Sequence, residues 1–222
     1  MKYFEQDFLN FFKELEENNN KNWFDENRKR YLKIVKDPFN NFVTDLIAEL
    51  SLDDNITMQA KDAIFRINRD IRFSADKTPY KNHVGAIISA MTKKDNFYPG
   101  YYFQLGYEGI NLAGGIYQAD KHQILNFRTY IANNLDEFQE VINDKKFVKY
   151  YGKLQGEKNK IIPKDFKEIA KKEPYLANKQ LYYWTELDKK HIISDNIKEL
   201  LIEYYYAAKD VKDFLTKAVL NN

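Results

Sequence analysis

Cysteine is absent from the 222 residues, and long apolar runs are absent as well. The missing thiols exclude thiol catalysis, disulfide bonds and cysteine-ligated zinc sites. A membrane-spanning helix needs about 18 or more consecutive apolar residues, and no segment approaches that length. We therefore expect no membrane partner, and no residue pattern points to a metal or to another cofactor.

An excess of one charge is missing too. The chain has 35 Lys and Arg against 33 Asp and Glu, a net charge of +2, which argues against a globally basic nucleic-acid-binding protein. Apolar residues make up 44% and aromatic residues 16%, which is typical of a globular protein. The length predicts a single domain over 1–222. No pattern of a targeting segment is visible, so we expect a cytoplasmic protein.

Apolar residues recur at helical spacing in the first fifty positions. The first stripe consists of Phe4, Phe8, Phe11, Phe12 and Leu15. Three asparagines at 18–20 predict its end, because asparagine tolerates the conformation that closes helices. A second helix is predicted over 23–35. Asp37 followed by Pro38 predicts a cap and the start of a third helix that runs to Leu50.

The middle of the chain changes its period. Segments 84–91, 100–107 and 110–117 predict strands, and 63–68 predicts a shorter one. Glu108-Gly109 predicts a two-residue hairpin turn between two of them. Strands joined by turns favour an antiparallel sheet. We therefore predict an α+β fold, with an antiparallel sheet of about four to six strands flanked by N-terminal and C-terminal helices.

Helical spacing returns after Asp120, which predicts an N-cap. Segment 145–190 is mixed, with short helices around Phe147 and Ile169 and an added strand over 179–187. Ser194 is expected to cap a long final helix. Residues 143–190 hold 13 basic and 7 acidic side chains, a net +6 that we interpret as a solvated lysine-rich face.

Arginine is concentrated in one segment. The chain has only 6 arginines beside 29 lysines, and three of the six, Arg66, Arg69 and Arg72, fall within seven residues. The guanidinium group grips a phosphate or carboxylate through a planar fork of donors, which lysine lacks. Residues 65–83 also contain Lys77 and Lys81 against two aspartates, a net charge of +3. Phe73 is expected to be a buried anchor for this loop.

The same segment resembles a known family. The residues that carry the resemblance are Arg66, Arg69-Asp70, Arg72-Phe73, Asp76-Lys77 and Tyr80. At these spacings they are similar to the signature of a sparsely distributed bacterial family, domain of unknown function 2461. Further landmarks also resemble it, namely an early Asn-Asn followed by Trp23-Phe24 and Tyr31, then Pro79-Tyr80-Lys81, Gly114-Gly115 and Pro163-Lys164 with Phe166. Asp165 stands where the family pattern has glycine. The resemblance points to residues but implies no reaction.

Two interpretations of the arginine segment stay open. In the first, the cations Arg66, Arg69, Arg72, Lys77 and Lys81 bind an anionic small molecule. In the second, the arginines and the carboxylates of Asp70 and Asp76 form an internal ion network that only pins the loop. The surplus of positive charge favours the first, since unpaired buried cations are costly.

Catalysis is a further possibility at this segment. If the protein is an enzyme, it hydrolyses or transfers a group on an anionic substrate, with the arginines stabilising developing charge. Asp70 and Asp76 are expected to have low pKa values and to orient the arginines, although Asp70 is also a candidate base. Tyr80 and His83 are then the preferred proton carriers.

Other readings are weaker. A nucleic-acid-binding module is disfavoured because strand 99–107 departs from the RNA-recognition pattern at several positions. Tyr182-Tyr183-Trp184 and Tyr204-Tyr205-Tyr206 suggest an interaction surface, and three adjacent tyrosines on a helix cannot all be core. Gly114-Gly115 lacks nucleotide-loop spacing and is read as a bulge. The three histidines have no metal-site spacing.

Overall fold

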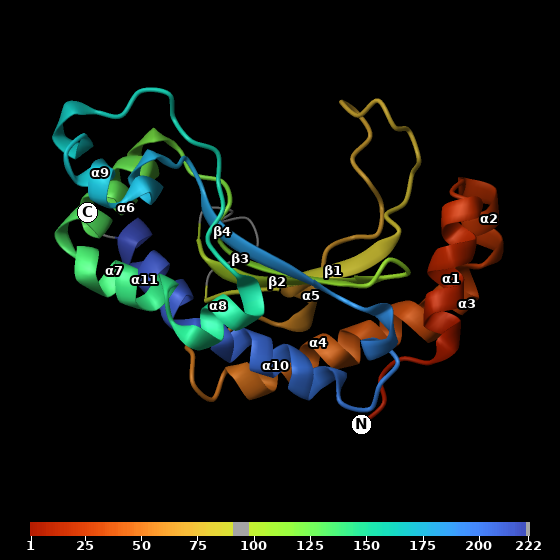
Figure 1. Cartoon of the computed structure of the whole chain (residues 1–222). Helices are drawn as coiled ribbons and strands as arrows, with labels where there is room; N and C mark the ends of the chain where they lie inside the picture. Colours follow the sequence, from red (N-terminus) through yellow and green to blue (C-terminus); the bar gives the residue numbers. More distant parts are fainter. Residues whose placement is uncertain (91–97, 221–222) are drawn as a thin grey trace. The chain divides into compact units, whose positions relative to one another are not determined.

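A four-stranded antiparallel sheet with strand order β1-β2-β3-β4 organises the chain. The structure is a computed structural model that describes residues 1–90 and 98–220. The strands are β1 (His83–Ile88), β2 (Gly100–Gly106), β3 (Ile110–Ile116) and β4 (Leu181–Leu187). Helices flank the sheet, which confirms the predicted α+β class (Figure 1). No helix within the described ranges is long and apolar enough to cross a membrane.

Contacts group the described residues into two compact units. Unit 1 contains residues 1–90, 102–112 and 186–202, and unit 2 contains residues 98–101, 113–185 and 203–220. Strands β2, β3 and β4 each contribute residues to both units. No single position in the sequence therefore separates them, and the single domain over 1–222 stays a prediction.

The helices of unit 1 come mainly from the N-terminal third. They are α1 (Gln6–Glu17), α2 (Lys21–Glu26), α3 (Arg28–Tyr31), the π-helical turn Leu32–Lys36, α4 (Asp37–Leu50) and α5 (Ala60–Ala63). The predicted cap at Asp37 is wrong, because its backbone is helical and the chain turns continuously from α3 into α4. The π-helical turn lets Pro38 enter at the start of α4 without ending the helix.

Phenylalanine rings build the core of unit 1. The rings of Phe4 and Phe8 lie 4.7 Å apart along the stripe that the sequence predicts. On α4, Phe39 and Phe42 contact Phe103 of β2 at 6.0 and 5.9 Å. All five side chains are at most 1% exposed. Helix α4 thus packs on the face of the sheet that carries the odd-numbered residues of β2.

The β2–β3 hairpin turns one residue earlier than predicted. Gly106 and Gly109 exchange backbone hydrogen bonds of 3.1 and 3.3 Å, so Tyr107 and Glu108 form the turn. Gly109 has a φ of +148°, and a Cβ there would overlap with the carbonyl oxygen of Leu187. Gly109 therefore lies directly after the two turn residues, where the missing side chain lets β4 approach closely.

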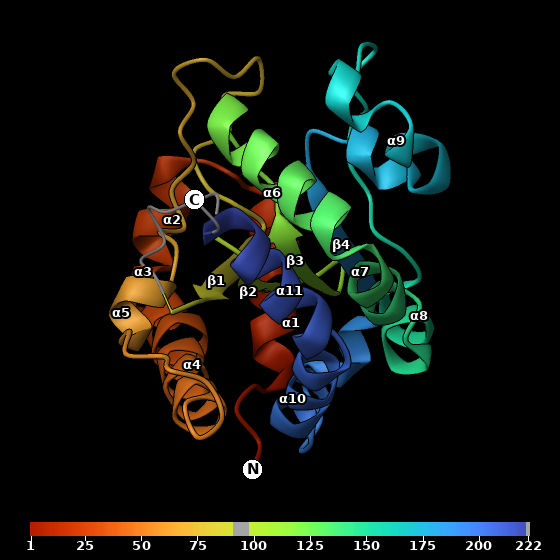
Figure 2. The ribbon, with the colours of Figure 1, turned by 90° about the vertical axis from the view of Figure 1, so that its left-hand side faces the viewer.

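Unit 2 is mostly helical, and α6, α7 and α11 lie together in it (Figure 2). Its elements are α6 (Lys121–Asn133), α7 (Leu135–Ile142), α8 (Lys145–Tyr151), the 3-10 turn Lys164–Phe166, α9 (Ile169–Lys172), the 3-10 turn Pro174–Ala177 and α11 (Lys209–Leu220). The predicted N-cap is confirmed, because Asp120 accepts from Gln123 N and Gln123 accepts from Asp120 N in a capping box.

Three further predictions differ from the structure. The final helix is split into α10 (Ile197–Ala207) and α11, and Ser194 donates to His191 O instead of capping α10. Segment 63–68 pairs only through isolated bridges at Ile64 and Asn68. Strand β1 ends at Ile88, and the predicted end at 91 lies outside the described residues.

The two glycines Gly115 and Gly152 give a matched test of unit 2. Both have positive φ, +95° and +76°, but only at Gly115 would a Cβ overlap with backbone, the carbonyl oxygen of Leu181. We expect Gly115→Ala to lower the free energy of unfolding by more than about 2 kcal/mol, and Gly152→Ala by about 1 kcal/mol from backbone strain alone. Urea denaturation measures both. Equal losses would contradict the close approach of β3 and β4.

Candidate functional site

The basic loop, residues 66–81, stands on two paired limbs of backbone in unit 1. Arg69 N donates to Pro79 O and Lys81 N donates to Ile67 O, each at 2.9 Å. Phe65 N donates to Gly85 O at 2.9 Å, which joins the base of the loop to β1. The segment between the limbs projects away from β1, on the side opposite α4 (Figure 1). The limbs therefore fix the two ends of the loop while its tip is exposed.

Asn19, between α1 and α2, clamps one limb. Its Nδ2 donates to Tyr80 O at 2.9 Å, and Tyr80 N donates to Asn19 Oδ1 at 3.1 Å. The same Nδ2 reaches Asn82 Oδ1 at 3.2 Å. The Tyr80 ring stacks on Phe24 of α2, with centroids 4.0 Å apart. Tyr80, one of the residues that carry the family resemblance, is thus held in place by both its backbone and its ring.

Two of the three arginines bind carboxylates inside the loop. Arg69 donates to Asp76 and to Thr78, and its side chain is 26% exposed. Arg72 grips Asp70 through Nε at 2.9 Å and Nη2 at 2.6 Å. These hydrogen bonds, including those from the backbone, hold the pKa values of both carboxyls at about 2. The low pKa values match the prediction and make both aspartates poor bases at neutral pH.

The predicted anchor Phe73 is wrong. Its side chain is 95% exposed at the tip of the loop, beside the Arg72 guanidinium at 5.8 Å from the ring centroid. The backbone pairing and the Asn19 clamp supply the fixation that an apolar anchor was expected to give.

Three cations of the loop form no ion pair with a carboxylate among residues 1–90 and 98–220, although the charge of Arg66 contributes to the low pKa of Asp70. They are Arg66, Lys77 and Lys81. Lys77 donates to Ile71 O at 2.9 Å. Lys81 lies over the Phe65 ring at 5.4 Å and is half-buried. Burial and the neighbouring Arg66 lower the pKa of Lys81. The predicted surplus of +3 thus resides on these three side chains.

His83 and Lys81 lie at the edge of a polar sheet face in unit 1. A Cβ added at Gly85 would lie 3.3 Å from the Tyr102 hydroxyl. That hydroxyl donates a hydrogen bond to Gln104 at 2.7 Å. A Cβ at Gly106 would lie 3.0 Å from the His83 Cβ, so His83 faces the same side. Burial, and then Lys81, lower the pKa of His83 to about 4. The imidazole is therefore neutral at neutral pH.

The two expected proton carriers are not brought together. The Tyr80 ring stacks on Phe24 of α2, and burial and then Asp25 raise the pKa of its hydroxyl. His83 instead neighbours Lys81. A concerted role of Tyr80 and His83 on one substrate has no support in this geometry.

Other candidate features have structural partners. The space above Gly114 is filled by the Tyr183 ring, which leaves no room there for a ligand. Within the described ranges no group of three or more His, Asp or Glu side chains could hold a metal ion. Tyr205 is 3% and Tyr206 39% exposed, which confirms that the tyrosine run is not all core.

Sequence reasoning missed Asn19, Tyr102 and Gln104. The asparagines at 18–20 predict a helix stop and resemble the start of the family, and no local pattern connects Asn19 with a loop sixty residues away. Tyr102 and Gln104 alternate with the buried residues of β2, so the polar half of that strand was the signal that could have identified the face.

A family model described as conserved hypothetical protein (DUF2461) matches residues 7–214. The match covers both units and the whole basic loop. No curated protein and no solved structure matches the chain.

His83 should make stability depend on pH. The unfolded chain binds a proton at this histidine with a pKa near 6.5, and the folded protein with a pKa of about 4. The free energy of unfolding should therefore fall as the pH drops from about 6.5 to about 4, by up to about 3 kcal/mol. His83→Gln should remove this slope in urea denaturation, whereas the exposed His122→Gln should keep it. Equal slopes in both variants would refute the assignment.

The Asn19 clamp gives a second prediction. Asn19→Ala leaves the backbone N–H and C=O of the buried Tyr80 without their partner. We expect a loss of about 1–3 kcal/mol in urea denaturation and faster hydrogen exchange at the Tyr80 amide. The control is Asn18→Ala, which removes one exposed hydrogen bond to Glu14 O. The clamp is not needed if the two variants behave alike.

Proposed function

We propose that this chain, which belongs to the family of conserved hypothetical proteins (DUF2461), binds a small molecule carrying a phosphate or carboxylate group at its basic loop. The observation that carries the proposal is Lys81, a half-buried cation whose pKa is lowered and which has no carboxylate partner in the described part of the chain. An anion at Nζ would offset the desolvation of this ammonium group.

Arg66 and Lys81 are the proposed primary ligands. They lie close enough for Arg66 to lower the pKa of Lys81, so one anion can neutralise both. The exposed Arg66 forms no ion pair in the described part of the chain, and its guanidinium offers the bidentate grip on phosphate or carboxylate oxygens. Lys77 supplements the charge from the exposed part of the loop.

Arg69 and Arg72 take different roles in this proposal. Arg69 is a positioning residue, because its Nη1 is directed to Asp76 and Thr78 and its side chain is only 26% exposed. Arg72 keeps Nη1 available beyond its grip on Asp70 and is 75% exposed, so it contributes to the field around the ligand. The internal ion network and the anion site thus share one loop: the network shapes it, and the remaining cations bind.

The titrating groups favour binding over proton transfer. Asp70 and Asp76 have pKa values of about 2 and His83 of about 4, so none is matched to general base catalysis near neutral pH. Because these groups are not matched to general base catalysis, the proposal includes hydrolysis or group transfer only for a substrate that supplies its own reactive group. In that reaction the arginines would stabilise the developing charge.

Thermal denaturation with pyrophosphate tests the anion site. Pyrophosphate should raise the melting temperature of the wild type above that in sodium chloride of equal ionic strength. Arg66→Gln and Lys81→Met should each weaken the apparent affinity about tenfold or more, since each removes a charge-assisted contact. Lys81→Met should not lower the melting temperature without ligand, because it removes an unpaired half-buried cation.

Two controls complete the experiment. Arg72→Gln should weaken binding less than Arg66→Gln, because this guanidinium is already engaged with Asp70. Lys146→Gln, an exposed lysine of unit 2 at the start of α8, should leave the response unchanged. If the double variant Arg66→Gln, Lys81→Met keeps the full pyrophosphate response, the loop does not bind the anion.

A further inference from the structure

The polar sheet face lies within unit 1, on the side of β1 and β2 that does not pack against α4. The basic loop projects on this same side of the sheet (Figure 1). Strand alternation places four side chains on the face: His83 and Ile87 of β1, and Tyr102 and Gln104 of β2. All four are half-buried, and none is acidic.

Two contacts fix the orientation of Gln104 on this face. A Cβ added at Gly85 would lie 3.4 Å from Gln104 Cβ and 3.3 Å from the Tyr102 hydroxyl, so the two side chains of β2 meet over Gly85. The hydroxyl donates to Gln104 Oε1 at 2.7 Å. Burial raises the pKa of Tyr102 to about 12, so the hydroxyl keeps its proton at neutral pH. Because Oε1 is the acceptor of this bond, Gln104 presents Nε2 as a donor.

The unpartnered polar atoms of this face are open to solvent. Among the described residues, the side-chain atoms that are fully buried without a hydrogen bond are Asn111 Oδ1 and Asn178 Oδ1. Gln104 Nε2 and the ring nitrogens of His83 also make no hydrogen bond in the described chain, but they are not enclosed in this way. A ligand can therefore reach them.

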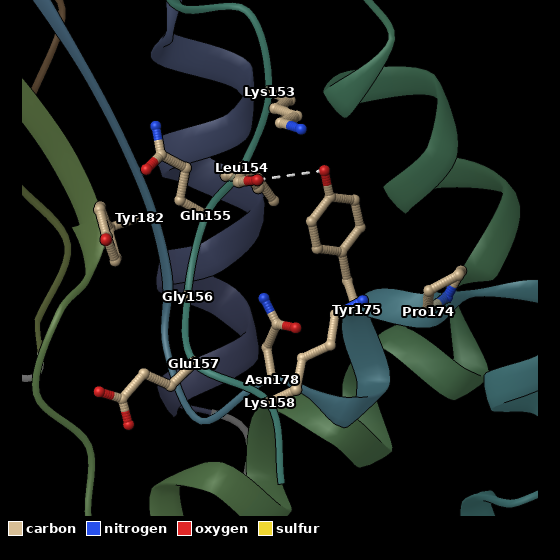
Figure 3. A pocket seen from close by; sticks show the side chains of 10 residues that line it. All are labelled: Lys153, Leu154, Gln155, Gly156, Glu157, Lys158, Pro174, Tyr175, Asn178 and Tyr182. Carbon is tan, nitrogen blue, oxygen red and sulfur yellow. Dashed lines mark hydrogen bonds between the residues drawn. The ribbon is translucent and has the colours of Figure 1, made fainter.

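The cavity of unit 2 presents the opposite situation. It has a volume of about 800 Å³, and its lining includes segment 153–158, Tyr175, Asn178 and Tyr182 (Figure 3). Asn178 is 1% exposed with its Oδ1 enclosed, so this unpartnered oxygen cannot meet a ligand in the cavity. The Tyr175 hydroxyl already donates to Leu154 O at 3.2 Å. Unmet hydrogen bonds that a ligand can satisfy lie on the polar sheet face and not at Asn178.

Lys81 joins the polar sheet face to the proposed anion site. Its ammonium group lies over the Phe65 ring at 5.4 Å, and that ring lies 6.1 Å from the ring of Tyr102. Lys81 is also close enough to His83 to help lower its pKa. An anion held by Arg66 and Lys81 would therefore lie beside the neutral polar groups of the sheet.

We propose that the ligand of the basic loop is a phosphate ester of a sugar or of a similar polyhydroxy compound, and that Gln104 and His83 bind its hydroxyl groups. This ligand class rests on the proposed function, because it takes the phosphate to lie at Arg66 and Lys81. A phosphate monoester carries a charge of about −1.5 to −2 at pH 7, which matches two cations. The guanidinium adds a bidentate grip on its oxygens.

The chemistry of the face favours hydroxyl groups over other ligand bodies. A neutral imidazole offers one donor and one acceptor, and a hydroxyl group offers both as well. The low pKa of His83 keeps its ring neutral near pH 7. The side chains that β1 and β2 place on this face include no carboxylate to attract an amine. An apolar body would cover Gln104 Nε2 and the His83 nitrogens without replacing their hydrogen bonds to water, which is costly.

Isothermal titration of the full chain with matched phosphate esters tests this ligand class. Glucose 6-phosphate, ribose 5-phosphate and glycerol 3-phosphate carry hydroxyl groups, whereas n-propyl phosphate carries the same anionic group without them. At least one of the three should bind at least tenfold more tightly than n-propyl phosphate, because only the hydroxylated esters can form hydrogen bonds with the polar sheet face.

Gln104→Met separates recognition of the hydroxyl groups from a structural role. This variant keeps the length of the side chain and loses the Nε2 donor. It should weaken binding of the preferred hydroxylated ester about tenfold and leave the affinity for n-propyl phosphate unchanged. Tyr102→Phe removes the hydroxyl that orients Gln104 and should weaken the same ester by a smaller factor. Gln6→Met makes the matched change at an exposed position of α1 and should alter neither affinity.

The outcomes separate this ligand class from the proposed function. If neither pyrophosphate nor any phosphate ester binds, the proposed function fails and the ligand class fails with it. If pyrophosphate and n-propyl phosphate bind and no hydroxylated ester binds more tightly, the ligand class alone is refuted. It is also refuted if Gln104→Met binds the hydroxylated ester as the wild type does, or if this variant loses affinity for n-propyl phosphate to the same extent.

Discussion

The antiparallel pairing between the two limbs of the basic loop is the constraint on which the candidate site of unit 1 depends. Three backbone hydrogen bonds and the Asn19 clamp fix residues 65–69 against 79–85. Because backbone hydrogen bonds hold the two limbs together, the side chains of the loop do not have to pack in the core and can be charged. That division explains why Phe73 is exposed and why Lys81 can be held over Phe65 without an ion pair.

Charge in this loop is sorted by position. Asp70 binds the Arg72 side chain two residues later in the chain. Asp76 accepts a hydrogen bond from the backbone of Thr78, also two residues later, and pairs with Arg69. Each aspartate therefore neutralises one arginine of the same loop. The cations outside these short-range pairs carry the surplus. A purely internal network would leave the loop near neutrality, because an unpaired and partly desolvated cation opposes folding. Under the proposed function, the structural and the ligand-binding interpretations of the arginine segment are complementary: the first applies to the paired arginines and the second to the remaining cations.

Patterns of local origin were predictable, and contacts of long range were not. The helical stripe of α1, the capping box at Asp120 and the four strands follow from spacing and cap chemistry, which operate within a few residues. The hairpin was misplaced by one residue because either pair in Tyr107-Glu108-Gly109 can form a turn, and contact with β4 decides between them. The charge of the loop was readable, whereas the clamp by Asn19 depends on how α1 and α2 fold back on it.

Lys81 and Asn178 present the same physical situation with different chemistry. Each is a polar group withdrawn from water without an ion-pair or hydrogen-bond partner in the described chain, and this withdrawal opposes folding. A bound partner would offset that penalty and so link ligand occupancy to stability. The penalty has a different remedy in each case, because an ammonium group attracts a negative charge whereas a buried carboxamide requires a matched donor and acceptor. Removal of either group should therefore not destabilise the free chain, so stability measured without ligand is separable from affinity at the proposed anion site.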